Sequence, residues 1–310
     1  MPADRTRVGV LERPSRADFA LIAIGVAGVS TSAPLIKAAV APTLAIAFWR
    51  NLIASGVVLP VAAVRNRTEL RSLDRRERRL AALAGLLLAA HFATWIPSLS
   101  FTSVASSVAL VATQPVWAAL IARARGDAVA GRAWLGIAIA VAGAVLLSGI
   151  DLQVSARALG GDVLALVGGI FAALYVTVGA EVRRTVSTTA YTSICYAVAA
   201  VTLLVVCLVS GADLSGYTAG TWWRILALTA LAQLLGHSIF NHVLRTTSPT
   251  VVSIAILFEI VGAAVLAAIF IGERPPLVAV PAAALIAAGV VLVVRSGARQ
   301  PEVAGVPIVE

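Results

Sequence analysis

Charged residues are scarce in this sequence. They make up 13% of its 310 residues, whereas hydrophobic residues make up 60%. About a quarter of the residues are charged in a typical soluble domain, so the composition excludes one. Lysine occurs once, at Lys37, and arginine therefore carries nearly all of the formal net charge of +9. The arginines flank long apolar runs, which favours a membrane protein over a protein that binds nucleic acid.

Cysteine and phosphate-binding motifs are also nearly absent. The two cysteines, Cys195 and Cys207, lie in one apolar stretch, so their spacing predicts neither a disulfide framework nor a metal site. No glycine-rich loop of the form GxxxxGK[ST] occurs, which argues against direct use of ATP by this chain. Because the acidic residues are scattered and the connecting segments are short, we expect no enzyme activity, no cofactor and no metal.

Ten apolar stretches are each long enough to cross the hydrocarbon core of a bilayer as a helix. The sequence therefore predicts an all-α integral membrane protein with ten transmembrane helices. These stretches cover residues 18–37, 43–64, 80–99, 101–122, 132–150, 161–180, 189–210, 221–243, 249–271 and 276–295.

Arginine is distributed unequally between the two sets of connecting segments. If the N-terminus is cytoplasmic, 19 arginines lie in or beside cytoplasmic segments, and only Lys37 and three arginines lie on the other side. This bias predicts a multi-pass protein of the inner (plasma) membrane with cytoplasmic N- and C-termini. Segment 65–79 holds seven of these arginines and is expected to anchor that side, where contact with anionic lipid is a secondary effect.

The chain contains an internal repeat with a shift of 145 residues. SFTSVASSVALVATQPVW at 100–117 aligns with RTTSPTVVSIAILFEIVG at 245–262, which places Gln114 on Glu259. Each half holds five predicted spans and, because five is odd, the second half is inverted relative to the first. Inverted repeats are typical of transporters that bind substrate near the membrane midplane. The predicted parts are a tail (1–17), a first repeat (18–150), a linker (151–160), a second repeat (161–295) and a tail (296–310).

Several stretches resemble the EamA-type permeases of the drug/metabolite transporter superfamily. They are AFWRNLIA at 47–54, TQPVWAALIARARGD at 113–127, WLGIAIAVAGAVLL at 134–147, LFEIVGAAVLAAIFIGER at 257–274 and ALIAAGVVLV at 284–293. The resemblance covers about residues 20–295 and implies a ten-helix carrier of small metabolites, often an exporter of amino acids or similar compounds. Two residues depart from the family pattern. Asp127 replaces a glutamate, and Ile260 replaces the proline that would kink the ninth helix after Glu259.

Glu259 is the only charged residue between Pro249 and Ile271. A carboxylate at that depth is costly unless it is paired, hydrated or protonated. It either binds a cationic group of the substrate or carries a proton that couples transport to the proton gradient. The alternative is a structural acid, held by hydroxyl groups or by a buried arginine. Gln114, its repeat partner, either contacts substrate or forms a hydrogen bond between helices.

Histidines mark two further helix faces. His91 and Trp95 are four residues apart in the third span, and His237 and Asn241 have the same spacing in the eighth. Residues at this spacing share one face of a helix, so we expect both faces to line one cavity. The alternatives are hydrogen-bonded packing for the histidines and aromatic packing for Trp95.

Three more polar residues lie within or at the ends of the spans. Arg50 either holds a substrate carboxylate, or it snorkels outward or pairs with carbonyl groups and helps to hold the helices together. Tyr175, in the middle of the sixth span, is a further candidate for the cavity. Lys37, near the end of the first span, is expected to snorkel.

We expect a secondary transporter, opening alternately to each side around a midplane site, with a small polar metabolite such as an amino acid as substrate. Its other expected partners are the lipid bilayer and, if transport is coupled, protons. Nucleic acid is not expected, and the oligomeric state is a monomer or a homodimer. The alternative is a channel, or a sensor or structural subunit that transports nothing.

Overall fold

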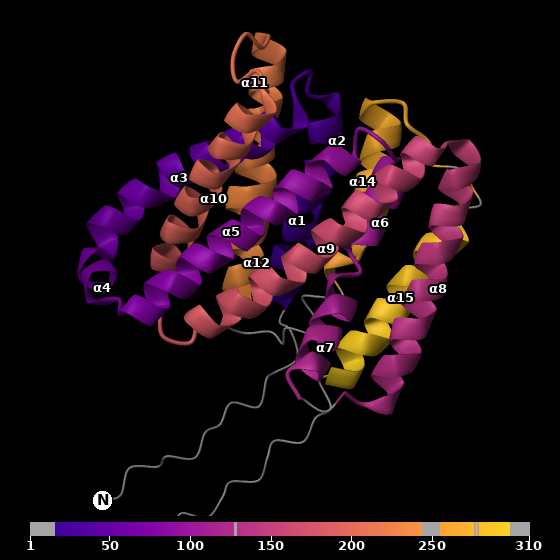
Figure 1. The fold of residues 1–310 in the computed structure, drawn as a ribbon, viewed down its shortest axis with the longest axis horizontal. Helices are drawn as coiled ribbons and strands as arrows, with labels where there is room; N and C mark the ends of the chain where they lie inside the picture. Colours follow the sequence, from indigo (N-terminus) through magenta and orange to yellow (C-terminus); the bar gives the residue numbers. More distant parts are fainter. Residues whose placement is uncertain (1–15, 127–128, 244–254, 276, 278, 298–310) are drawn as a thin grey trace, which may run out of the picture.

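The computed structural model describes residues 16–126, 129–243, 255–275, 277 and 279–297, and these residues form helices and no strand. Figure 1 shows the helices gathered in one bundle. In the first half they are α1 (Arg16–Ser30), α2 (Ser32–Ala38), α3 (Thr43–Arg65), α4 (Arg67–Ser72), α5 (Arg75–Ser98), α6 (Val104–Val111), α7 (Gln114–Ala124) and α8 (Gly131–Val154).

The second half begins with α9 directly after α8. Its helices are α9 (Ala156–Val182), α10 (Thr188–Ser210), α11 (Ala219–Ala227), the π-helix η1 (Leu228–Gly236), α12 (His237–Val243), α14 (Phe258–Phe270) and α15 (Ala279–Gly297). Residues 151–160 were expected to be a linker. In the structure only Ser155 separates α8 from α9, and its hydroxyl accepts a hydrogen bond from the Ala158 N–H and caps α9.

Most of the described residues in the predicted spans are helical. In the described part of the chain, eight helical stretches are long and apolar enough to cross a membrane, and two apolar helices, Gly131–Leu146 and Phe258–Phe270, are shorter. The protein is therefore a multi-pass membrane protein. The stretch 249–254 of the ninth predicted span lies outside the described residues.

The helices pack in a regular set of pairs. Helix α5 of the first half packs along α9 of the second, and η1 and α12 of the second half pack on α1 of the first. The pairs α8 with α15, α3 with α10 and α6 with α14 also join the two halves. Glycines allow some of these close approaches: a Cβ added at Gly289 would lie 2.5 Å from the Gly136 carbonyl oxygen.

Three of the spans are interrupted. The first breaks at Thr31, between α1 and α2, and the fourth breaks at Ala112 and Thr113, between α6 and α7. In the ninth, Leu257 forms a turn before α14, although Ile260 stands where the family pattern has proline. The breaks in the fourth and ninth spans place Gln114 and Glu259 in the first turn of a helix.

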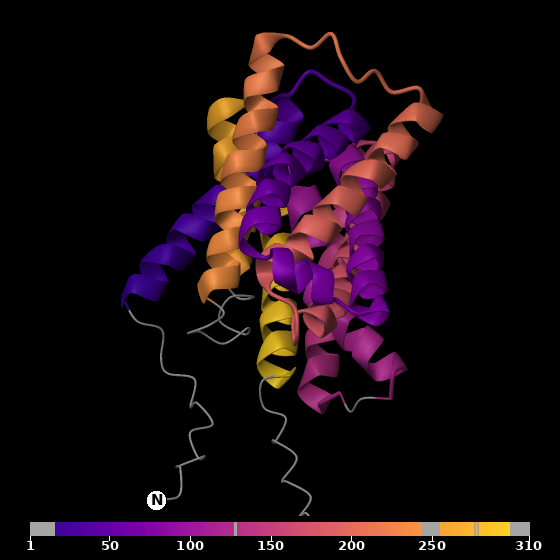
Figure 2. The ribbon, with the colours of Figure 1, turned by 90° about the vertical axis from the view of Figure 1, so that its left-hand side faces the viewer.

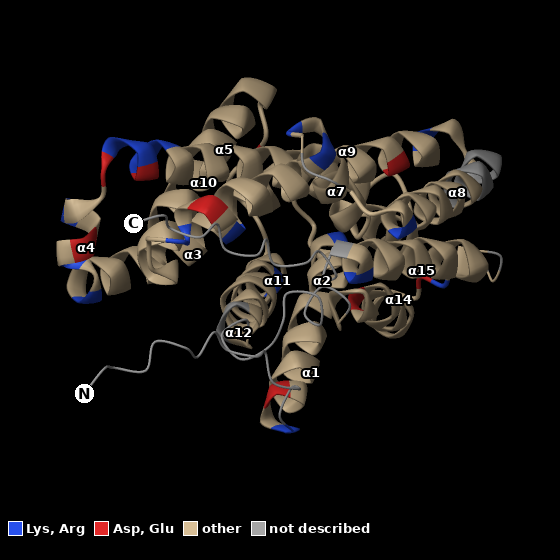
Figure 3. Ribbon diagram, turned by 90° about the horizontal axis from the view of Figure 1, so that it is seen from below, with Lys and Arg blue, Asp and Glu red and all other residues tan. Residues whose placement is uncertain are grey.

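The two ends of the bundle differ in charge. We call one the arginine-rich end, where α3 ends, α5 begins and α9 meets α10; in Figure 3 the charged residues colour the ribbon of α4 and the start of α5. α1 begins and α15 ends at this same end (Figure 2). We call the other the distal end; it carries Lys37, Leu214 and Glu273.

Candidate functional site

Arg50 lies inside the bundle. It is on α3 and only 1% of its surface is exposed, so of the alternatives for Arg50 outward snorkelling is wrong. Its Nε donates a hydrogen bond to Gln233 Oε1 at 2.8 Å, and its Cζ lies 4.3 Å from the centroid of the Phe92 ring. Its Nη1 is buried and has no hydrogen-bond partner among the described residues. Arg50 thus joins α3 to α5 and η1 while one N–H-bearing atom remains unused.

Gln233 holds Arg50 and was missed by the sequence analysis. It lies in η1, is 3% exposed, and its Nε2 is 3.5 Å from Asn51 Oδ1. Asn51 in turn donates from Nδ2 to the Ala47 carbonyl at 2.8 Å. The available signal was a lone amide in an apolar run, four residues before His237.

His91 and Trp95 share a face of α5, as predicted. Their rings stack with centroids 5.6 Å apart and an interplanar angle of 9°. His91 Nδ1 lies 2.9 Å from the Gly168 carbonyl oxygen on α9. Trp95 is buried, which fits aromatic packing, while His91 is half-buried and keeps part of its surface open.

Glu259 and Gln114 occupy matching places in the two halves. Each is half-buried in the first turn of a helix that follows a break. Unpaired backbone N–H groups and the helix dipole favour negative charge in a first turn, which lowers the cost of a carboxylate there. A related arrangement is common in transporters, where interrupted helices present their ends to substrate.

Ionisable side chains from both halves lie within electrostatic range of Arg50. We call Arg50, Glu259, His91 and His237 the Arg50 group. The guanidinium of Arg50 lies within electrostatic range of Glu259, His91 and His237, and His237 also lies within range of His91. These side chains come from α3, α14, α5 and α12. His237 itself is exposed. The structure therefore brings together four of the residues that the sequence analysis singled out.

Two other predicted site residues remain. Tyr175 is half-buried on α9 and interacts with Tyr191, Cys195 and Tyr196 on α10. The side chain of Asn241 lies outside the described residues.

Beside the Arg50 group is a small pocket of about 180 Å³, whose lining is largely apolar but includes several hydroxyl groups. It lies between α3, α10 and the η1–α12 segment, and its lining includes Gln233, the partner of Arg50. It is lined by Val57, Val58, Val61, Thr188, Thr189, Thr192, Tyr196, Gln233, Leu234 and Ser238.

A larger, apolar groove of about 830 Å³ separates α1 from α14. Phe258 and Gly262 of α14 line one wall, and Phe19, Val26 and Ser30 of α1 line the other. The Ser30 hydroxyl is buried without a partner among the described residues. Because its lining is almost wholly apolar, the groove suits lipid chains better than a polar substrate.

At the distal end, Lys37 forms an ion pair with Glu273, so the expected snorkelling is wrong here too. Lys37 Nζ also donates to the Thr102 carbonyl at 3.1 Å, and Glu273 accepts the Val104 N–H at 2.5 Å. Gly272, with φ of +70°, makes the left-handed turn that lets Glu273 reach back. Glu273 thus ties the end of α14 to α2 and to the first turn of α6.

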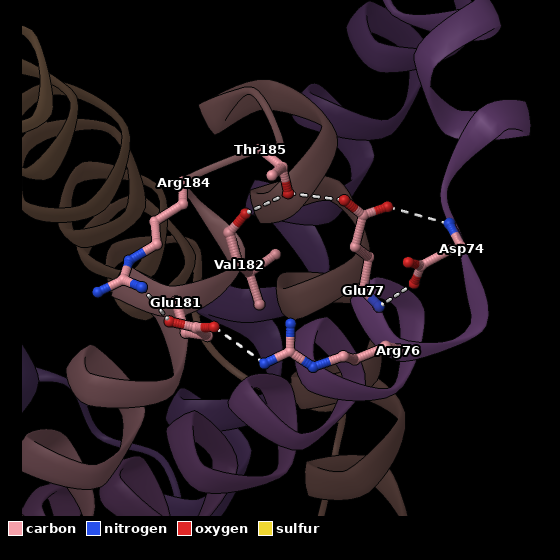
Figure 4. A network of polar contacts seen from close by, with 7 residues as sticks. All are labelled: Asp74, Arg76, Glu77, Glu181, Val182, Arg184 and Thr185. Atoms are coloured by element: carbon pink, nitrogen blue, oxygen red, sulfur yellow. Dashed lines mark hydrogen bonds and ion pairs between the residues drawn. The ribbon is translucent and has the colours of Figure 1, made fainter. Parts of the chain in front are cut away.

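At the arginine-rich end, acidic side chains join the α3–α5 connection to the α9–α10 connection. Glu77 accepts from the Thr185 hydroxyl at 2.6 Å, and Arg76 pairs with Glu181 at 2.9 Å (Figure 4). Glu69 accepts from the Ser187 N–H at 2.5 Å and from the Ser187 hydroxyl at 2.7 Å. Burial opposes the charge on Glu69, but its hydrogen bonds from Ser187 and Asn66 hold its pKa below the ordinary value.

No group of three or more histidine, cysteine, aspartate or glutamate side chains lies close enough to hold a metal ion within the residues that the structure describes. Both cysteines are free thiols and buried.

The sequence matches the EamA-like transporter family twice, over residues 17–149 and again over residues 159–295. The chain belongs to the EamA-like transporter family. The two matches correspond to the two halves that share the 145-residue repeat, and the members of this family are transporters.

A solved structure described as "Crystal structure of protein" is similar to this chain, with a TM-score of 0.61 and 17% sequence identity. The similarity covers 92% of this chain and 100% of the other, and it supports the fold of this EamA-like protein. No curated protein matches the sequence.

Proposed function

We propose that this EamA-like protein is a secondary transporter that exports a small polar metabolite such as an amino acid. The observation that carries the proposal is the Arg50 group, in which ionisable side chains from both halves lie within electrostatic range of a buried arginine. Such residues are costly in a membrane, and when they face the interior they are typical of substrate or ion pathways. The family, whose members are transporters, supports the same conclusion.

The helix pairs support a ten-span arrangement of two inverted repeats. If the spans are numbered in order, the pairs are third with sixth, eighth with first, fifth with tenth, second with seventh and fourth with ninth. When each span is replaced by the span five places away in the chain, the third–sixth pair becomes the eighth–first pair. Each of the other three pairs becomes itself, so the set of pairs is unchanged. A two-fold relation between five-span halves has this property, and it inverts the second half in the membrane.

The contacts at the distal end support alternating access. Lys37 and Glu273 join the two halves there, as expected of a conformation closed at that end. With the arginine-rich end in the cytoplasm, as the arginine bias favours, this is closure toward the outside of the inner membrane. Opening to that side requires the ion pair to break, and export follows if substrate enters from the cytoplasm.

Glu259 can serve this cycle in two ways. It binds a cationic group of the substrate, or it takes up and releases a proton in each cycle and so couples transport to the proton gradient. Its place in a first turn, within range of Arg50, supports a role that uses its charge.

Reconstitution into liposomes tests the proposal. The full chain should give efflux of a loaded metabolite that saturates with concentration, and Glu259→Gln should fold normally and lose it. Gln114→Glu is an informative second variant, since it adds the acid at the matching position of the other half. Non-saturable flux would indicate a channel, and no flux with any metabolite would indicate a sensor or structural subunit.

A further inference from the structure

We infer that Arg50 is the anchor for a carboxylate of the transported molecule, and that Gln233 in the π-helix positions it. The inference rests on the proposed transport function and names the chemical class of its substrate.

The contacts of Arg50 leave hydrogen-bonding capacity for a carboxylate. Its Nε is used by Gln233, one face of the guanidinium is covered by Phe92, and Nη1 is buried with no partner in the described part of the chain. A buried charged group with an unused N–H is costly. A carboxylate matches the planar fork of a guanidinium and can accept two of its N–H groups.

The partner of Arg50 in the protein is an amide, whereas the ordinary partner of a buried arginine is a carboxylate. Among the described residues the ion pairs are Lys37 with Glu273 and Glu181 with Arg76 and Arg184, and Arg50 takes part in none of them. Glu259 lies within electrostatic range but forms no direct pair with it. Gln233 therefore orients the guanidinium without neutralising it, and the charge remains available to a ligand.

Charge balance narrows the substrate further. A bound carboxylate places a second negative charge near Glu259, and like charges in a poorly solvated site repel strongly. The site returns to balance when the ligand also carries a cationic group near Glu259, or when Glu259 takes up a proton. Zwitterions therefore need no proton, whereas simple carboxylates bind together with one.

The π-helix accounts for the placement of Gln233. A π-helical turn holds an extra residue relative to an α-helical turn and is frequent at functional sites. In η1 it directs Gln233 between Asn51 and Arg50, where the side chain is 3% exposed. Gln233 is thus a positioning residue, since it acts on the ligand through Arg50.

The test uses the full chain in liposomes that are loaded with matched sets of compounds. Each set holds an amino acid, its amide and the amine that lacks the carboxyl group, for leucine, phenylalanine, threonine and glutamate; lactate and succinate are added as carboxylates without an amine. Mass spectrometry measures which compounds leave. We expect the acids to leave at least about tenfold faster than their amides, and lactate and succinate to leave faster as the pH falls.

Variants separate anchoring from folding. Arg50→Gln should fold and lose the preference for acids, and Arg50→Lys should keep part of it because the charge remains without the fork. Gln233→Leu should reduce the preference, and Gln233→Glu should reduce it more because its carboxylate occupies Arg50. Thr229→Val is the matched control in η1, since the Thr229 hydroxyl bonds only to Ile225 of its own helical segment.

Two results would overturn the inference. Saturable efflux with equal rates for acids and amides, or an unchanged acid preference in folded Arg50→Gln, contradicts the carboxylate anchor and leaves the transport function standing. Absence of saturable efflux for every compound overturns the transport function, and the anchor with it.

Discussion

The two halves of the chain meet in two related helix pairs, and these pairs differ greatly in regularity. α5 and α9 form the regular pair; each is one unbroken helix, of 24 and 27 residues. The 145-residue repeat relates α5 to the segment α11–η1–α12, and α9 to α1 and α2. In this irregular pair one member contains a π-helix and the other breaks at Thr31. The two pairs are therefore related by the repeat, but the helices of one pair are regular and those of the other are irregular.

The deformed parts of the irregular pair lie against one another. A Cβ added at Gly28 of α1 would lie 2.8 Å from the Leu231 carbonyl oxygen in η1, and one added at Gly236 would lie 2.8 Å from Val29 Cγ1. The groove between α1 and α14 opens beside them. Segments with irregular backbone and few neighbours move at low cost, so we expect the irregular pair to move during transport and the regular pair to serve as its frame.

The largest effect is expected from Gly28→Leu. The new side chain meets a backbone oxygen that cannot rotate away, so α1 must withdraw from η1, at a cost of about 1–3 kcal/mol. Transport should fall at least about tenfold in the reconstituted protein. Gly56→Leu is the control, because no atom lies within 4 Å of a Cβ at that position. Equal transport by the two variants would show that the irregular pair does not need this close contact.

Removal of the π-helix should have the next largest effect. Deleting the exposed Ala230 allows η1 to become an α-helix and rotates Gln233 away from its place. We expect a melting curve close to that of the parent protein, since most helical hydrogen bonds are kept, together with a loss of transport. Transport that survives the deletion would mean that the irregularity serves packing alone.

A charge exchange at Lys37 and Glu273 should have a smaller effect. Each single reversal, Lys37→Glu or Glu273→Lys, places like charges together at the end of the irregular pair. The double exchange should restore about 1 kcal/mol of coupling. Restoration stays partial because lysine cannot accept the Val104 N–H. Labelling of a cysteine at Thr102 measures opening of the distal end; equal labelling in all four proteins would contradict its role as a closing contact.

Much of the helical pattern could be predicted from the sequence, because twenty apolar residues between arginines have few other structures open to them. The stacking of His91 and Trp95 followed from their spacing, since residues four apart on a helix are neighbours. The family followed from the motifs around Arg50, Gln114 and Glu259.

Other features depend on contacts between distant residues. Lys37 was expected to snorkel because Glu273, which is 236 positions away, could not be placed beside it. The sequence left the alternatives for Arg50 open for the same reason, since Gln233 and Phe92 lie on other helices. The π-helix could not be predicted from its residues, because the sequence LTALAQLLG is equally suited to an α-helix. The carboxylate site was one of two alternatives from the sequence, and the buried Nη1 is the observation that favours it.

The smallest effect is expected at the arginine-rich end, beside the regular pair, where Glu69 joins α4 to Ser187, the N-cap residue of α10. Since hydrogen bonds hold its folded pKa below the unfolded value, Glu69 stabilises the fold above the unfolded pKa and loses this contribution as the pH falls through the folded pKa. Glu69→Gln should therefore cost roughly 1 kcal/mol at pH 7, at the low end because solvent reaches the carboxylate. Thermal unfolding in detergent should show the two proteins converging as the pH is lowered through the acidic range. Glu181→Gln is the control, since its partners Arg76 and Arg184 are exposed. If the difference in stability between Glu69→Gln and the parent protein is independent of pH, the effect of the substitution comes from packing. The arginine-rich end then has no electrostatic contribution from Glu69.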